Sequence, residues 1–376
     1  MSRAITSPGD QSATFVELFF DLVFVFGITQ IVALLHHDMS WVGVGHAVLV
    51  FWLVWWAWTQ FTWALNSADT THPFVEFSTL IATAVAFFMS VSIPNSFDGH
   101  AVWFAVSYVL VRSLGLGVYA AVSRADPDQR AAVRLFTAAS TGGLAAVLVG
   151  AFLGGSAQVW AWTLAILLDV VAATIGGRAH GWHIHAEHFA ERHGLIVIIA
   201  LGESLIVAAA GLTDAELTPD VIVVSFLGVL ISCGLWWTYF PIAKPELERA
   251  LAATPTADQG STARDAFSLA HFPMLCGVVA YAVALEEAIA HPGDPLTSST
   301  RLALALGLFL FVGGTALAMW RATCGRPTAR VVIISVTAAT LLLLAGQPAF
   351  VSLAVALAGV GLIALLDERR AGRMSA

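Results

Sequence analysis

Charged residues are scarce in this sequence. Only 11% of its 376 residues are Asp, Glu, Lys or Arg, whereas 58% are hydrophobic, and the mean hydropathy is +0.82. Soluble domains carry about 25% charged residues, so this composition excludes a water-soluble enzyme or binding domain. The 17 Lys and Arg residues are scattered and form no basic patch, so we expect no nucleic-acid partner.

Cysteine is rare as well. The three cysteines, Cys233, Cys276 and Cys324, form no CxxC pair, so we expect neither a disulfide framework nor a thiolate metal site, and no bound cofactor. No phosphate-binding loop or paired catalytic signature occurs. A secretory signal peptide is not expected either, because the first apolar run contains Glu17 and Asp21.

The sequence does contain a series of long apolar runs, separated by short segments with Pro and Gly. Runs of about 18 to 25 apolar residues are long enough to cross a lipid bilayer as helices. We therefore predict an all-α, polytopic integral membrane protein in contact with the lipid bilayer. The twelve expected transmembrane helices cover residues 15–36, 41–65, 76–93, 101–122, 131–153, 157–177, 192–210, 221–240, 266–290, 300–321, 330–345 and 349–366.

The positions of the basic residues test this count. With twelve crossings, fifteen of the 17 Lys and Arg residues fall on one side of the membrane. Of the other two, Arg301 lies on the opposite side and Arg112 lies within a span. Because basic residues concentrate in the cytoplasmic loops of membrane proteins, both termini are expected in the cytoplasm.

Similarities between the two halves of the chain favour an internal repeat. Glu17 and Glu191 stand at the starts of the first and seventh spans, and the tryptophan-rich segment 55–61 resembles residues 236–240 of the eighth span. An even number of spans per half gives both halves the same orientation. We therefore predict two parallel six-helix repeats, residues 1–180 and 181–376, which together form one membrane domain with its polar surfaces at the shared interface.

Two parts of the sequence resemble the signatures of one family. The segment VELFFDLVFVFGITQ at 16–30, and HFAERHGL at 188–195 followed by LGES at 201–204, are similar to the signatures of the bacterial low temperature requirement A family. The matching residues are Glu17, Phe20, Asp21, His188, Glu191, Arg192, Gly194, Gly202, Glu203 and Ser204. His193 departs from the pattern, which has an aromatic residue there. The resemblance covers essentially the whole chain and implies a bacterial inner-membrane protein, but it supplies no substrate or reaction.

Four charged residues are expected inside the membrane, where a charge is costly unless it faces a partner or a hydrated cavity. They are Asp21, Arg112, Asp169 and Glu203. Three carboxylates against one arginine leave two carboxylates that must be protonated, hydrated or bound to a cation. This excess favours a channel or secondary transporter for a small cation or a proton.

Two acidic residues are expected at the ends of spans instead. Glu17 is interpreted as stabilising the N-terminus of the first span, where the helix dipole favours a carboxylate. Glu191 and Arg192 are interpreted as marking the cytoplasmic start of the seventh span.

Histidines gather ahead of the seventh span. They are His180, His183, His185, His188 and His193, with Glu187 and Glu191 among them. His185 and His188 are three residues apart and could bind a metal ion together with Glu191, which leaves open an integral-membrane enzyme at the cytoplasmic face. Solvated interfacial histidines and a pH sensor are the other interpretations. A structural membrane protein whose polar residues only pair helices, and a homo-oligomer, are also compatible with the sequence.

Overall fold

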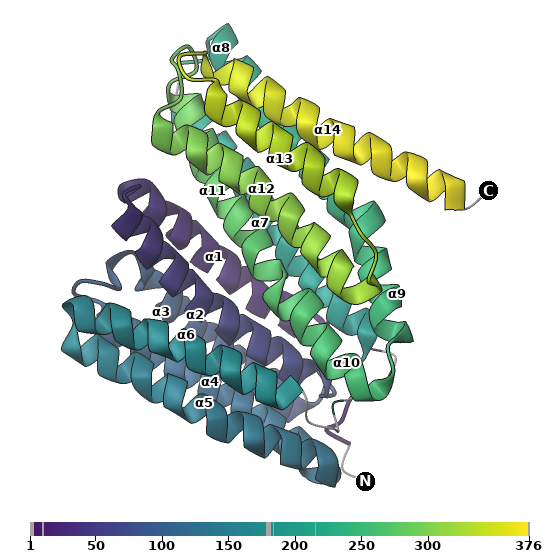
Figure 1. The fold of residues 1–376 in the computed structure, drawn as a ribbon. Helices are drawn as coiled ribbons and strands as arrows, with labels where there is room; N and C mark the ends of the chain where they lie inside the picture. Colours follow the sequence, from purple (N-terminus) through teal and green to yellow (C-terminus); the bar gives the residue numbers. More distant parts are fainter. Residues whose placement is uncertain (1–3, 10, 178–181, 183, 215, 375–376) are drawn as a thin grey trace. The chain divides into compact units, whose positions relative to one another are not determined.

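The chain was examined as a computed structural model that describes residues 4–9, 11–177, 182, 184–214 and 216–374. His180 and His183 lie outside these residues. The described part of the chain is helical, and its extended contacts are limited to two isolated bridges, Thr6 with Ala68 and Pro295 with Pro348. The main helices are α1 (Phe15–His37), α2 (Trp41–Asn66), α3 (Pro73–Val91), α4 (Ala101–Val122), α5 (Pro127–Leu153), α6 (Gly155–Gly177), α7 (Ala186–Asp214), α8 (Pro219–Thr238), α9 (Lys244–Ala253), α10 (Thr256–Thr262), α11 (His271–Ala290), α12 (Ser298–Thr323), α13 (Thr328–Leu343) and α14 (Ala349–Met374) (Figure 1).

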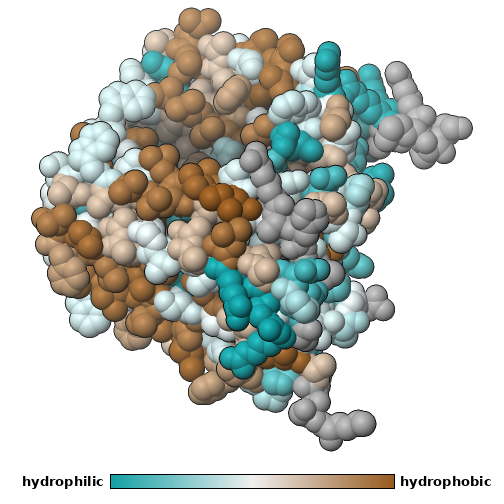
Figure 2. Space-filling view, turned by 60° about the horizontal axis from the view of Figure 1, so that its bottom comes forward, coloured by the Kyte–Doolittle hydropathy of each residue, from teal (hydrophilic) through white to brown (hydrophobic). Residues whose placement is uncertain are grey.

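These helices confirm a multi-pass helical membrane protein. In the described residues, eleven helices are long and apolar enough to cross a membrane, and α13 is a shorter apolar helix. Large apolar side chains such as Phe152, Leu153 and Trp160 are more than half exposed, as lipid contact requires. The space-filling view shows hydrophobic residues over much of the face it presents, beside patches of hydrophilic residues (Figure 2).

The predicted spans agree with the helices to within a few residues over most of the chain. Two helices differ more: α14 ends at Met374, eight residues after the predicted end at 366, and α7 begins at Ala186, six residues before the predicted start at Arg192. Residues 244–262, expected between two spans, form α9 and α10. The predicted span 330–345 corresponds to α13, whose 16 residues extend only ~24 Å at 1.5 Å per residue.

Local sequence determines where several helices begin. The side-chain oxygens of Ser40, Asp126 and Thr218 accept hydrogen bonds from backbone N–H groups in the first turns of α2, α5 and α8. Proline occupies the first position of α3, α5 and α8, where the N–H group it lacks would have no partner within the helix.

The helices gather into two compact units. The first contains Met1–Leu195 together with Leu251–Ser268, and the second contains Ile196–Ala250 together with Leu269–Ala376. In the first unit, α2 packs against α1, α4 and α6, and α5 lies between α4 and α6. α2 is therefore central to this unit, and it is also the helix that carries most of its tryptophans.

The second unit contains a cycle of neighbouring helices. α8 packs against α11, α11 against α12, α12 against α13, α13 against α14, and α14 returns to α8. The predicted pair of six-helix repeats, with its boundary at residue 180, stays a prediction.

Candidate functional site

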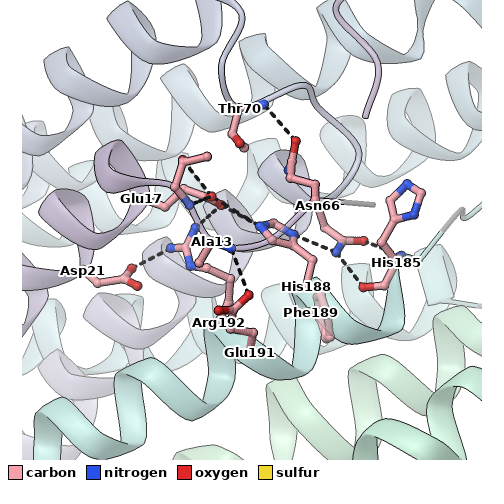
Figure 3. Close-up of polar contacts among 12 residues, drawn as sticks. Ala13, Glu17, Asp21, Asn66, Thr70, His185, His188, Phe189, Glu191 and Arg192 are labelled. Carbon is pink, nitrogen blue, oxygen red and sulfur yellow. Dashed lines mark hydrogen bonds and ion pairs between the residues drawn. The ribbon is translucent and has the colours of Figure 1, made fainter. Parts of the chain in front are cut away.

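Arg192 is the centre of a buried polar cluster in the first unit (Figure 3). Because α7 begins at Ala186, Arg192 lies within the helix, and its side chain is completely buried. Its Nη1 donates a hydrogen bond to Oε1 of Glu17 at 2.5 Å, and its Nη2 donates to Oδ1 of Asp21 at 2.6 Å. Glu17 and Asp21 are four residues apart on one face of α1. One arginine of α7 therefore binds two carboxylates of α1.

Glu17 also closes the N-terminus of α1. Its Oε2 accepts hydrogen bonds from the backbone N of Thr14 at 2.9 Å and from the Thr14 hydroxyl at 3.0 Å, so the Glu17 side chain reaches back to the N-cap residue. Nε2 of His188 lies 3.0 Å from Oε1. The prediction that Glu17 stabilises the helix N-terminus is thus confirmed. The same carboxylate is in addition bound by Arg192 and His188 of α7, which the sequence did not predict.

Asn66 determines the protonation state of His188. Its Oδ1 accepts a hydrogen bond from the backbone N of His185, and its Nδ2 donates to the backbone O of His185, both at 3.0 Å. These two bonds identify which end of the amide is the NH₂ group. The same Nδ2 lies 3.1 Å from Nδ1 of His188, so this ring nitrogen is an acceptor and carries no proton. His188 is therefore neutral, and its Nε2–H donates to Glu17.

The cluster consequently carries one net negative charge. Glu17 and Asp21 contribute two negative charges, and Arg192 contributes one positive charge. Both donors to Asp21, Arg192 and the indole N–H of Trp58 at 2.7 Å, bind its Oδ1. Oδ2 of Asp21 is buried and has no hydrogen-bond partner among the residues that the structure describes. A buried carboxylate oxygen without a partner is costly, so this atom is the natural position for an added proton.

Arg112 and Asp169 form a second buried pair, between α4 and α6. Nη1 and Nη2 of Arg112 lie 3.2 and 3.1 Å from Oδ2 and Oδ1 of Asp169. The Tyr108 hydroxyl accepts from Nη1 at 2.5 Å and donates to Asp169 at 3.3 Å. Gln60 of α2 accepts from Nε of Arg112 and donates to its carbonyl oxygen at 3.1 Å. Of the anions proposed for Arg112, Asp169 is thus the one that binds it, and both carboxylate oxygens have donors.

The predicted excess of carboxylates must be corrected for Arg192. The sequence-based count placed this arginine at the start of a span and left it out. In the first unit, Asp169 is paired with Arg112, while Glu17 and Asp21 share Arg192. Among these five residues one negative charge remains, and it belongs to the cluster around Arg192.

Glu203 lies on the part of α7 that belongs to the second unit, and only 1% of its surface is exposed. Its neighbour Ser204 lies 2.9 Å, hydroxyl to hydroxyl, from Ser232 of α8. Tyr281 of α11 donates to the carbonyl oxygen of Gly228 in α8 at 2.6 Å. These hydroxyl contacts join helices of the second unit. A role for Glu203 in ion binding stays a prediction.

His193 lies among aromatic rings. Its Nδ1 is 2.9 Å from the carbonyl oxygen of Phe189. The ring centroids of Trp55, Trp58 and Phe267 are 6.1, 5.1 and 5.2 Å away, with steep angles between the ring planes. An aromatic residue, which the family pattern has at this position, would meet the same neighbours. His193 therefore takes part in aromatic packing.

The predicted metal site is not assembled. His185 is the residue just before α7, and its backbone N and O bond to the side chain of Asn66. Both ring nitrogens of His188 have partners, and Oε2 of Glu191 accepts a hydrogen bond from the backbone N of Ala13 at 2.9 Å. Within the described part of the chain, no group of three or more His, Cys, Asp or Glu side chains could hold a metal ion.

A small cavity of ≈ 40 Å³ adjoins the Arg112 pair. It is lined by Gln60, the residue that binds Arg112, and by Thr59, Tyr119 and Ser268, among others. About 10–15 Å³ of such space accommodates one water molecule, so this cavity has room for more than one. The Thr59 hydroxyl has no hydrogen-bond partner among the described residues, which fits a hydrated cavity.

Sequence reasoning missed four residues of these sites. Gln60 and Asn66 are uncharged amides within or at the end of a highly apolar run, and this contrast is the signal that could have found them. Tyr108 precedes Arg112 by four residues and so shares its helix face. Trp58 is one of several tryptophans in α2, and nothing in the sequence separates it from the neighbouring ones.

Comparison with known proteins shows the family of the chain. The family model described as "Bacterial low temperature requirement A protein (LtrA)" matches residues 12–365. The chain belongs to the LtrA family. It is also 31% identical over 323 residues to an uncharacterized protein of Rhizobium meliloti (strain 1021), covering 82% of this chain and 76% of the relative. No solved structure matches it significantly. The two LtrA-like signatures, on α1 and α7, thus supply Glu17, Asp21, His188 and Arg192 to a single cluster.

Proposed function

We propose that this LtrA-family protein moves protons or a small cation across the membrane, as a channel or secondary transporter, and that Asp21 takes up the proton or cation. The observation that carries the proposal is the uncompensated charge of the buried cluster. With His188 neutral, Glu17 and Asp21 are opposed by Arg192 alone. Oδ2 of Asp21 is also the carboxylate oxygen of the cluster that lacks a hydrogen-bond partner in the described residues.

The surroundings of Asp21 favour a proton over a metal cation. A metal cation such as Mg²⁺ or Ca²⁺ needs about six or more oxygen ligands. Here the guanidinium of Arg192 is 2.6 Å from Oδ1 of Asp21, and Glu17 is occupied by Arg192, His188 and Thr14. A cation would be repelled by the guanidinium and would find few oxygens, whereas a proton needs only the single oxygen Oδ2.

Proton uptake would change the link between α1 and α7. A protonated Asp21 is neutral, so its bond to Arg192 loses its ionic character, and Arg192 remains held by Glu17. α7 is a continuous helix of 29 residues, so a change at Arg192 acts on a long element. The contact between Asp21 and Arg192 would thus have two states, one ionic and one with Asp21 neutral. A change between these states would couple protonation to movement of a solute.

The test is proton flux in reconstituted proteoliposomes. An internal pH-sensitive dye reports flux after an imposed pH gradient, with the membrane potential clamped, and parallel assays follow Na⁺ and K⁺. We expect flux in the wild type and a loss of roughly tenfold or more in Asp21→Asn, which keeps the shape of the side chain but removes the proton-binding carboxylate. Asp98→Asn, at an exposed carboxylate before α4, is the matched control and should leave flux unchanged.

Two results would count against the proposal. One is a wild-type protein that gives the same H⁺, Na⁺ and K⁺ fluxes as empty liposomes, which would favour the structural interpretation of the polar residues. The other is a folded Asp21→Asn protein with wild-type flux. Gel filtration and thermal unfolding of both variants separate a folding defect from a defect in transport.

A further inference from the structure

The second unit contains a pocket of ≈ 180 Å³ at one end of α12, α13 and α14. Arg326, in the segment between α12 and α13, and Arg370, on α14, line it and are exposed. Arg330, in the first turn of α13, also lines it but is only 2% exposed. Three arginines from three parts of the chain therefore converge on one pocket.

Hydrogen bonds hold the side chain of Arg330 in place, but one of its nitrogen atoms lacks an acceptor among the described residues. Its Nη2 lies 2.8 Å from Oδ2 of Asp367 and donates to the carbonyl oxygen of Thr238 at 3.0 Å. Its Nη1 is buried and has no hydrogen-bond partner in the part of the chain that the structure describes. A buried guanidinium nitrogen without an acceptor is costly, so an additional acceptor in the pocket would stabilise it.

The charges of the pocket favour an anion. Arg326, Arg330 and Arg370 oppose two carboxylates, Asp367 and Glu246, and Asp367 is already engaged by Arg330. The lining thus has a net positive charge. Guanidinium groups that approach from several directions suit a tetrahedral phosphate, whose oxygens accept several charge-assisted hydrogen bonds at once.

The pocket also lies at the end of the apolar helix α12, where Met319 and Thr323 line it. Trp320, which is 48% exposed, ends the apolar part of α12, and the guanidinium of Arg321 lies 5.7 Å from its ring centroid. Tryptophan and basic residues in this arrangement are typical of the membrane–water interface. Ile242 and Met319 add an apolar side to the pocket, which an isolated inorganic ion would not require.

We propose that this pocket binds a phosphate group, as carried by the headgroup of an anionic phospholipid or by free phosphate. The ligand phosphate accepts hydrogen bonds from Arg330 at the base of the pocket and from Arg326 and Arg370 at its mouth. This inference is independent of the transport proposal, because every residue in it belongs to the second unit.

Lipid binding to the purified protein tests the proposal. Native mass spectrometry of protein in detergent measures retained phosphatidylglycerol against phosphatidylcholine, and thermal unfolding with added inorganic phosphate measures the free anion. Arg330→Gln would break the contact with Asp367 and risks misfolding, so the test uses the double variant Arg326→Gln/Arg370→Gln at the exposed mouth. Arg369→Gln, at an exposed arginine that does not line the pocket, is the matched control.

We expect the wild type and Arg369→Gln to prefer phosphatidylglycerol, and the double variant to lose affinity by roughly tenfold or more. Stabilisation by inorganic phosphate alone would identify a soluble anion as the ligand, whereas a response to phosphatidylglycerol only would identify the lipid. The proposal is overturned if the double variant binds both probes as the wild type does, or if the wild type responds to neither.

Discussion

At the scale of single residues, Arg112 and Arg192, both buried in the first unit, differ in how completely their partners neutralise them. Arg112 has one carboxylate, Asp169, and it also donates to Tyr108 and Gln60. Arg192 is shared by two carboxylates, and one charge is left over. A neutral pair whose two carboxylate oxygens both have donors has little reason to change state, whereas a cluster with an excess charge responds to a proton. Arg112 therefore suits a structural role and Arg192 a functional one.

The Arg112–Asp169 pair makes a prediction about stability. Asp169→Asn leaves a buried guanidinium without a counter-charge, and breaking a buried ion pair from one side costs about 3–5 kcal/mol. The double variant Arg112→Met/Asp169→Leu removes both charges and should recover most of this loss, since apolar replacements of whole buried pairs are often neutral or stabilising. Chemical unfolding in detergent micelles measures the three free energies of unfolding. If the double variant is as unstable as Asp169→Asn, the unpaired charge of Arg112 is not the cause of the instability, and the prediction is wrong.

The tautomer of His188 makes a second prediction. In the wild type, ¹⁵N spectra of histidine-labelled protein should show a neutral ring with its proton on Nε2, because Nδ1 accepts from Asn66. Asn66→Asp replaces this donor by a group that only accepts, so His188 should take up a second proton. Asn95→Asp, at an exposed position, is the control and should leave the spectrum unchanged. A wild-type ring already protonated on both nitrogens near neutral pH would remove the charge excess on which the transport proposal rests.

At the scale of helices, the start of α7 decides the composition of the candidate site. An apolar run locates a span by its hydrophobic residues, and three of the six residues from Ala186 to Glu191 are Glu or His, so the run appears to begin at Arg192. Ala and Glu are nevertheless good helix formers, and the helix extends through them. This early start takes Arg192 from the end of a span to the interior of a helix, where it meets α1.

Packing between α11 and α12 depends on glycine at close approach. A Cβ atom added at Gly277 would lie 2.5 Å from the carbonyl oxygen of Gly307 and 2.6 Å from the backbone N of Phe311. Because these neighbours are backbone atoms, the helices would have to separate. Gly277→Ala should therefore destabilise the protein by about 1–3 kcal/mol, although alanine itself favours a helix. Gly313→Ala on α12, where the nearest atom is 4.0 Å away, should be neutral or slightly stabilising in the same unfolding assay.

At the scale of the whole molecule, the positions of the helices could be predicted from the sequence, whereas most contacts between residues of different helices could not. Apolar runs were sufficient to locate nearly all the helices and to recognise a membrane protein. They did not reveal that Glu17 of α1 meets Arg192 of α7, because in a helix that is apolar all round the pattern does not indicate which face is buried. The motif residues were recognisable from the sequence, but their pairing, and the contribution of Asn66 and Trp58, required the three-dimensional arrangement.

The number of crossings leads to the last prediction. Eleven helices in the described residues are long enough to span, and α13, at ~24 Å, is shorter than a hydrocarbon layer of ~30 Å. If α13 crosses, with local thinning of the bilayer, the chain crosses twelve times and both termini lie on the same side. If it does not, the C-terminus lies opposite the N-terminus, and Arg369, Arg370 and Arg373 are placed outside, against the preference of basic residues for the cytoplasm.

We therefore expect a C-terminal green fluorescent protein fusion to fluoresce and a C-terminal alkaline phosphatase fusion to be inactive. A phosphatase fusion ending between α11 and α12 should be active, and it serves as the positive control. An active phosphatase at the C-terminus would contradict twelve crossings and, with them, the predicted arrangement of two parallel six-helix repeats.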